Sequence, residues 1–247
     1  MVSRSNERCI AVFGLLCAQR PGSLLRPFFG CAAAGLASVT TAFAQDHDLQ
    51  QWTVFVAQGT VADDIVVQVD VQPRMTNNAS RLGQFQLSPS IGYKVSKKAT
   101  VYLGYMYVHT DPVDRPATDE NRIYQHVIYR VGKIGDVSIT ARTRLEERTL
   151  VGDEDLSVRF RQQLRAQVPL GDKDDAKLVA WTEAFYNLND ANWGPHAGLD
   201  RWRNLIGVDI PIAQGFMVEP AYLDQIVFRT GQDRHDQIAN VTLSYHF

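Results

Sequence analysis

Arginine and glutamate recur at alternating positions between residues 137 and 203, and they are the side chains of this sequence best suited to chemistry. The spacing Arg-x-Arg occurs three times in this region, and in a β-strand it places both guanidinium groups on one face. The candidate set is Arg142, Arg144, Glu146, Arg148, Arg159, Arg161, Arg165, Glu183, Arg201 and Arg203. Guanidinium groups bind carboxylates and other anions through paired hydrogen bonds. The set therefore predicts either an ion-paired network or a ring that binds anions.

Histidines beside acidic residues are the candidates for acid–base chemistry. They are His109, His126, His196 and His235, with Asp111, Asp119, Glu120 and Asp236 near them. A hydrolase of lipid or peptide needs a nucleophile, a base and an orienting acid in one place. No recognisable catalytic motif surrounds these histidines, and no H-x-x-x-H spacing occurs. We therefore expect no enzyme activity, no metal site and no cofactor, and we keep a hydrolase as the alternative.

The candidate residues lie on segments in which apolar and polar residues alternate, the pattern of strands with unlike surroundings on their two faces. Ten such arms follow one another from Asp64 to Phe247, and their lengths are near the roughly 9–11 residues that a tilted strand needs to cross a membrane. Pro89 and Pro220 lie inside arms, and we expect a β-bulge at each. The preceding arm, Trp52–Gln58, is predicted to be an extra strand, a plug, or a sign of twelve strands.

The first 44 residues resemble a secretory signal peptide. Basic residues precede a short apolar run that ends in Ala42-Phe43-Ala44, the pattern of a signal-peptidase site. We expect cleavage after Ala44 and a single domain over residues 45–247. Losing four arginines and one glutamate changes the net charge from −2 to −5, which argues against nucleic-acid binding. All three cysteines lie in the presequence, so the mature chain has no disulfide.

The alternation fits a transmembrane β-barrel better than a soluble all-β protein, such as a periplasmic binding protein. Short connections alternate with longer ones along the chain, as in outer-membrane barrels, which usually have an even number of strands. Aromatic residues lie near strand ends, as the girdles of such barrels require. The polar face carries arginine, glutamine and serine instead of a lysine–glutamate coat. We predict an antiparallel transmembrane β-barrel of about ten strands, with twelve as the alternative.

The sequence also resembles a known family. The residues that carry the resemblance are Trp52, Glu120-Asn121-Arg122 with Gln125, the block 142–148, Arg159-x-Arg161, Glu183 with Asn187, and Tyr245-His246-Phe247. Together they are similar to the DUF2490 outer-membrane β-barrels of Gram-negative bacteria, over essentially all of 50–247. The resemblance implies an outer-membrane location and this architecture, and no established activity. Tyr245 and Phe247 also resemble the C-terminal signal read by the barrel-assembly machinery.

Two functional readings of the lumen remain open at this point. The arginines and glutamates can form a salt-bridge network that fills and closes a narrow barrel, because buried charges must be paired. They can also form a constriction that favours a small anionic solute. The expected partners are outer-membrane lipid and lipopolysaccharide, the barrel-assembly machinery and, on the second reading, that anion.

Overall fold

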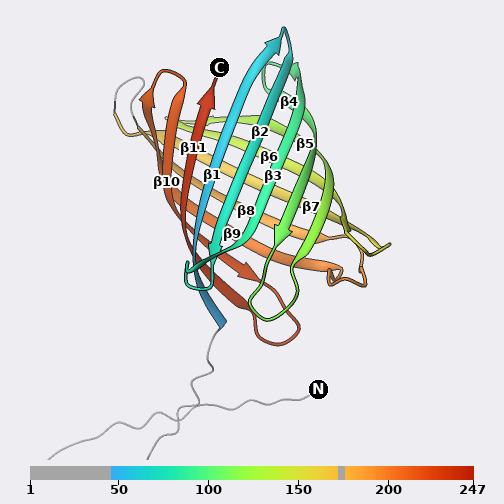
Figure 1. Ribbon diagram of the computed structural model, residues 1–247. Coiled ribbons are helices and arrows are strands. Elements are labelled where there is room, and N and C mark those ends of the chain that lie inside the picture. Colours follow the sequence, from blue (N-terminus) through green and yellow to red (C-terminus); the bar gives the residue numbers. More distant parts are fainter. Residues whose placement is uncertain (1–45, 172–175) are drawn as a thin grey trace, which may run out of the picture. The chain divides into compact units, whose positions relative to one another are not determined.

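The computed structural model describes residues 46–171 and 176–247, which form one closed β-barrel (Figure 1). Its strands are β1 (Asp46–Ala62), β2 (Ile65–Thr76), β3 (Arg81–Ser96), β4 (Ala99–Thr110), β5 (Thr118–Ile134), β6 (Val137–Leu150), β7 (Leu156–Pro169), β8 (Lys177–Asn187), β9 (Gly198–Ala213), β10 (Phe216–Val227) and β11 (Arg234–His246). The predicted all-β barrel is confirmed. The predicted signal peptide, 1–44, lies outside the described residues.

The barrel closes through a parallel pair of strands. Each strand from β2 to β10 pairs antiparallel with its neighbours in sequence, whereas β1 runs parallel to β11, from Asp46 opposite Arg234 to Gln58 opposite His246. The ten predicted arms after Asp64 are all strands, and the arm Trp52–Gln58 belongs to β1. The described part therefore has eleven strands, where the even-number rule led us to expect ten or twelve. Parallel closure of β1 with β11 accounts for the odd number.

The outer surface of the barrel is apolar and the inner surface carries the charges. Leu103, Leu164 and Ile206 expose about half of their surface to the outside, at 54%, 48% and 54%. Arg159 and Glu183 on the inner face are 2% exposed. This is the reverse of a soluble β-barrel, whose apolar face points inward. The predicted assignment of the two faces is confirmed. In the described residues, no helix is long and apolar enough to cross a membrane.

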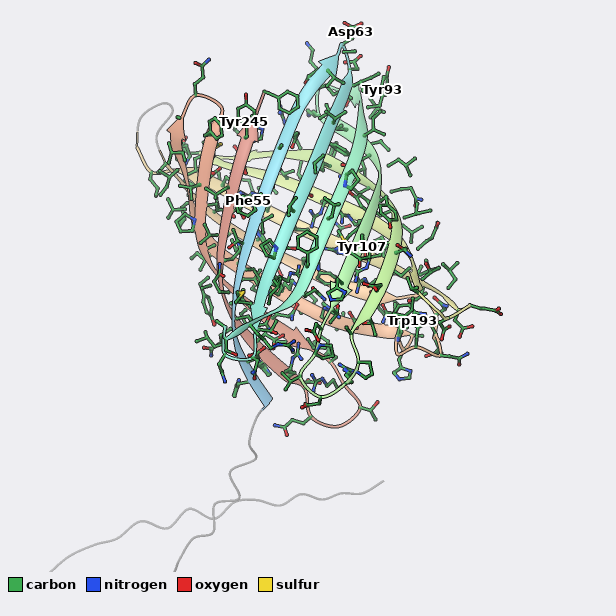
Figure 2. The ribbon with its side chains drawn as sticks, viewed as in Figure 1. Phe55, Asp63, Tyr93, Tyr107, Trp193 and Tyr245 are labelled. Carbon is green, nitrogen blue, oxygen red and sulfur yellow. The ribbon has the colours of Figure 1, made fainter. Side chains whose placement is uncertain are left out.

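The two rims of the barrel differ in the length of their connections. Turns such as 97–98, 135–136 and 214–215 lie at one rim, which also carries the C-terminus. The connections 111–117, 188–197 and 228–233 lie at the opposite rim. Figure 2 shows Tyr93 and Tyr245 near the short-turn rim, and Tyr107 and Trp193 toward the long-loop rim.

Two glycines allow tyrosine rings to lie against the inner wall. Gly92 is paired with Tyr102, and Gly104 with Tyr124, on adjacent strands. A Cβ atom at Gly104 would lie 2.2 Å from the Tyr124 ring, and one at Gly92 would lie 2.5 Å from the Tyr102 ring. The tyrosines therefore occupy the space that a side chain at each glycine would need.

The expected bulges at the two prolines do not occur. Pro89 and Pro220 each have a direct partner on one neighbouring strand, Val69 and Val241. On the other side two residues are unpaired, and the register continues unchanged beyond them. The missing N–H of proline thus interrupts the ladder locally without an inserted residue.

An apolar cluster fills part of the inside of the barrel. It consists of Trp52, Val179, Leu205, Leu223 and Ile238, with Trp181 and Ala221 against it. These residues come from β1 and from β8 to β11, which meet around the seam. Apolar side chains of these neighbouring strands therefore pack together inside the narrow barrel, beside the charged ones.

Candidate functional site

A cavity of about 710 Å³ runs along the inside of the barrel. At the short-turn rim it is lined by Met217 and His246, which lie near the start of β10 and at the end of β11. At the long-loop rim it is lined by Thr110, Arg115 and Trp193. One cavity therefore reaches both ends of the barrel.

Glu146 on β6 is the centre of the largest ion-paired network. Its Oε2 accepts hydrogen bonds from Nε and Nη2 of Arg159, at 3.0 and 2.6 Å, and its Oε1 accepts one from Arg161 at 2.6 Å. Arg144 lies 3.5 Å away on the third side. Arg161 also donates two hydrogen bonds to Glu183, which accepts another from Arg142 at 2.9 Å. The network joins β6, β7 and β8 across the lumen wall.

Smaller ion pairs continue this network toward both rims. Glu120 accepts hydrogen bonds from Arg122 and from Arg148, with closest distances of 2.8 and 2.6 Å. Arg165 is ion-paired with Glu219 across the lumen, from β7 to β10. These pairs hold the arginines in fixed positions, because a bidentate guanidinium–carboxylate pair restricts the orientation of both groups.

Positive charge exceeds negative charge along the cavity. Eleven arginines line it against six acidic residues, and Glu146 lies directly behind them as a seventh. The arginines are Arg74, Arg115, Arg122, Arg142, Arg144, Arg148, Arg159, Arg161, Arg165, Arg201 and Arg203. The facing wall on β2 and β3 is mostly neutral, with Gln68, Gln72, Gln84, Gln86 and Ser88. A cavity with this imbalance attracts anions and repels cations.

Several of these guanidinium groups stack on aromatic rings inside the barrel. Phe185 on β8 is 1% exposed, and the guanidinium carbons of Arg161 and Arg203 lie 4.2 and 4.6 Å from its ring centroid. Arg144 lies 4.1 Å from the ring centroid of Tyr124. Such stacking stabilises buried guanidinium groups that have few polar contacts.

The loop 188–197 covers part of the long-loop mouth. Asp155 in the neighbouring loop holds it, because its side chain accepts a hydrogen bond from the backbone N–H of Asn192 and its carbonyl accepts one from the Trp193 indole. The guanidinium of Arg148 lies 5.0 Å from the Trp193 ring centroid, and Trp193 lines the cavity. The loop therefore folds toward the lumen.

The candidate histidines lie in different places. His109 bonds to Asp119 at 2.8 Å on the outer surface, and Tyr107 donates to the same carboxylate. No serine or threonine hydroxyl bonds to His109 in the described part of the chain. His126 lies inside the barrel at 4% exposure, where Arg144 contacts it at 3.1 Å. Among the described residues, no group of three or more metal-binding side chains is present.

The structure brings the predicted arginine–glutamate set together. Nine of its ten residues line the cavity, and Glu146 is buried behind them. Trp52, Arg74 and Asp200 also line the cavity, and the sequence reading did not single them out as site residues. The alternation of β1 and β2 contained the necessary signal, since Trp52 and Arg74 lie on the inward positions of their strands.

The proposed assembly signal lies at the short-turn rim. Tyr245 stacks on Phe216 with 4.4 Å between ring centroids, and the Phe247 backbone N–H donates to the carbonyl of Gln58 at 3.1 Å. Tyr245 and Phe247 are 39% and 56% exposed. Both side chains are therefore accessible in the folded barrel.

This chain is similar to one relative, one solved structure and one protein family. An uncharacterized protein of Methylorubrum extorquens is 37% identical over 180 residues, which cover 72% of this chain and 78% of that protein. A solved structure of the NanC porin is similar in fold with a TM-score of 0.45, at 11% identity, and the match covers 74% of this chain and 89% of that one. The family model for a protein of unknown function, DUF2490, matches residues 49–236. The chain belongs to the DUF2490 family.

Proposed function

We propose that this barrel lies in the outer membrane of a Gram-negative bacterium and that its lumen is a narrow passage for small anions. The apolar outer surface supports a membrane location, because a closed barrel leaves no unpaired strand edge in lipid. The short turns at one rim and longer loops at the other support an outer-membrane orientation, with the short turns in the periplasm. On this proposal, outer-membrane lipid and lipopolysaccharide surround the barrel.

The observation that carries the proposal is the single cavity with an excess of arginine. Its lining extends from His246 at one rim to Thr110 at the other, and on this proposal a solute enters and leaves by different ends. The ion pairs of Glu146 and Glu183 hold several of the lining arginines in fixed positions. We propose no enzyme activity. At the His109–Asp119 pair the hydroxyl on the carboxylate belongs to Tyr107.

A closed, structural barrel is the second candidate. The observation that favours it is the loop 188–197, which places Trp193 on Arg148 at the long-loop mouth. In that case the ion-pair network has a purely structural role and the outer loops carry the function.

Conductance separates these two candidates. The protein is purified from the outer-membrane fraction of a Gram-negative host and inserted into a planar bilayer under a KCl gradient. We expect single-channel steps whose reversal potential shows a preference for chloride over potassium. Arg142→Ala should reduce this preference, because Arg142 lines the cavity and has a single carboxylate contact. Arg130→Ala is the matched control, since Arg130 is exposed and does not line the cavity.

The possible results have different meanings. Steps that prefer cations would contradict the proposal. A silent wild-type barrel that conducts after Arg142→Ala would establish the closed barrel instead. Recovery of the protein in the soluble fraction without detergent would contradict the membrane location.

A further inference from the structure

Two buried arginines in the lumen lack a carboxylate partner. Arg74 on β2 and Arg203 on β9 are each 7% exposed, and neither forms an ion pair among the described residues. Their neighbours differ in this respect, since Arg122, Arg159 and Arg161 all bond to glutamates. A buried charge without a partner of opposite sign is costly.

Neutral groups hold both guanidinium groups in place. Arg74 donates hydrogen bonds to the side-chain carbonyls of Gln84 and Gln72, both at 2.7 Å, and its Nε is buried with no partner. Arg203 donates from Nε to Gln225 at 2.7 Å. The amide of Gln225 in turn donates to Asp236, whose carboxylate is already ion-paired with Arg234. Glu183, which lies opposite Arg203 on the adjacent strand β8, is ion-paired with Arg142 and Arg161. The acids on this side are therefore engaged with other arginines.

Trp52 brings the two charges close together. The guanidinium carbons of Arg74 and Arg203 lie 3.6 and 4.9 Å from the centroid of its ring. The two carbons are therefore no more than about 8.5 Å apart, the sum of these distances. Both arginines line the cavity, and in the described structure the two terminal nitrogens of Arg203 donate to no protein acceptor. Two like charges at this separation, both lining the cavity, favour an anion beside them.

We propose that Arg74, Trp52 and Arg203 form a binding site for one small oxyanion, a carboxylate or phosphate group taken from the lumen. The two terminal nitrogens of the Arg203 guanidinium can donate paired hydrogen bonds to two oxygens of such a group. This proposal rests on the proposed function, because the anion reaches the site through the lumen. It adds the chemical class of the solute that binds inside the barrel.

Calorimetric titration of the purified barrel in detergent tests the site. Phosphate and acetate are titrated separately, in a buffer whose anion is a bulky sulfonate and at constant ionic strength. We expect one equivalent of at least one of these anions to bind. Arg203→Gln and Arg74→Gln should each weaken binding about tenfold or more, as expected for the loss of hydrogen bonds to a charged group. Arg130→Gln is the control and should bind as the wild type does, because Arg130 is exposed and does not line the cavity.

A stability measurement tests the site separately, in case a variant binds no anion. In the sulfonate buffer, Arg203→Gln should raise the urea midpoint of unfolding, because it removes an uncompensated charge. Arg161→Gln should lower the midpoint, because it breaks contacts to Glu146 and Glu183. A lowered midpoint for Arg203→Gln, no binding of either anion to the wild type, or equal binding by all variants would each overturn the site.

Failure of the site and failure of the passage are distinguishable. Binding of phosphate without acetate assigns the site to phosphate groups, and binding of acetate assigns it to carboxylates. Loss of binding in Arg74→Gln with unchanged chloride conductance supports the site independently of the passage. A wild-type barrel that binds the anion but does not conduct would refute the passage and leave the site intact.

Discussion

Glu146 shows how one residue organises the charges of the lumen. It is fully buried, and three guanidinium groups on β6 and β7 lie within 3.5 Å of its two oxygens. A buried network of this kind is stable only when each charge keeps its partner. Removing the single carboxylate leaves three positive charges close together in the wall of the barrel.

We expect Glu146→Ala to lower the free energy of unfolding by about 3–5 kcal/mol, the cost of breaking a buried ion pair from one side. Urea-dependent unfolding of the barrel in lipid vesicles, followed by electrophoretic mobility, measures this change. Glu147→Ala is the matched control, because Glu147 is the next residue and faces outward. Its effect should stay within about 0.5 kcal/mol. Equal losses for the two variants would contradict the role of Glu146.

At the scale of single residues, the sequence predicts which face of a strand a side chain occupies better than it predicts which residue that side chain contacts. Arg142, Arg159 and Arg203 could be assigned to the inner face because the alternation within a strand depends on that strand alone. The partner of Glu146 depends on the register between strands, which places Arg159 directly opposite it. Similarly, Trp52 lies opposite Arg74 only because β1 pairs with β2 in one particular register. A single sequence does not determine that register.

At the scale of the element, the glycines of β3 and β4 are as important as the charged residues. Gly104 leaves room for the Tyr124 ring, which lies against the wall and bonds to Ser88 through its hydroxyl at 2.8 Å. The Arg144 guanidinium also lies over the Tyr124 ring, and the same ring is stacked with the His126 ring. The position of one charged group thus depends on the absence of a side chain on the adjacent strand.

Gly104→Ala should lower the free energy of unfolding by about 1–3 kcal/mol, because the new Cβ overlaps the Tyr124 ring. In the double variant with Tyr124→Ala the overlap no longer exists, so the two effects should not add. The urea midpoints of the two single variants and the double variant measure this coupling. Additive effects would show that the ring and the glycine do not interact.

Loops and prolines were the elements least predictable from the sequence. The alternation located the connection 188–197, but its inward fold depends on hydrogen bonds that Asn192 and Trp193 donate to Asp155 in another loop. The bulges expected at Pro89 and Pro220 were wrong because the neighbouring strands tolerate a local gap in hydrogen bonding. Both outcomes depend on contacts between segments far apart in the sequence.

At the scale of the whole molecule, parallel closure places the two ends of the described chain at opposite rims. Asp46 lies beside Arg234 at the long-loop rim, and Phe247 lies at the short-turn rim beside Gln58 (Figure 1). In a barrel with antiparallel closure both ends would lie at the same rim. The orientation proposed above therefore places Asp46 outside the cell and Phe247 in the periplasm.

An epitope inserted between Gln45 and Asp46 should be accessible to antibody on intact cells. An epitope placed in the short turn 135–136 should become accessible only after the outer membrane is permeabilised. Flow cytometry before and after permeabilisation compares the two. Surface exposure of the turn epitope would show that the proposed orientation is inverted.

The seam also divides the eleven strands into two parts. Because β1 is parallel to β11 and antiparallel to β2, the strands β2 and β11 run in opposite directions on either side of it. Without β1, these two strands could meet as ordinary antiparallel neighbours and close a sheet of ten. β1 is therefore an additional strand in a sheet that already meets the usual rule of parity. It widens the ring by one strand and brings Trp52, whose ring contacts both Arg74 and Arg203, into the lumen.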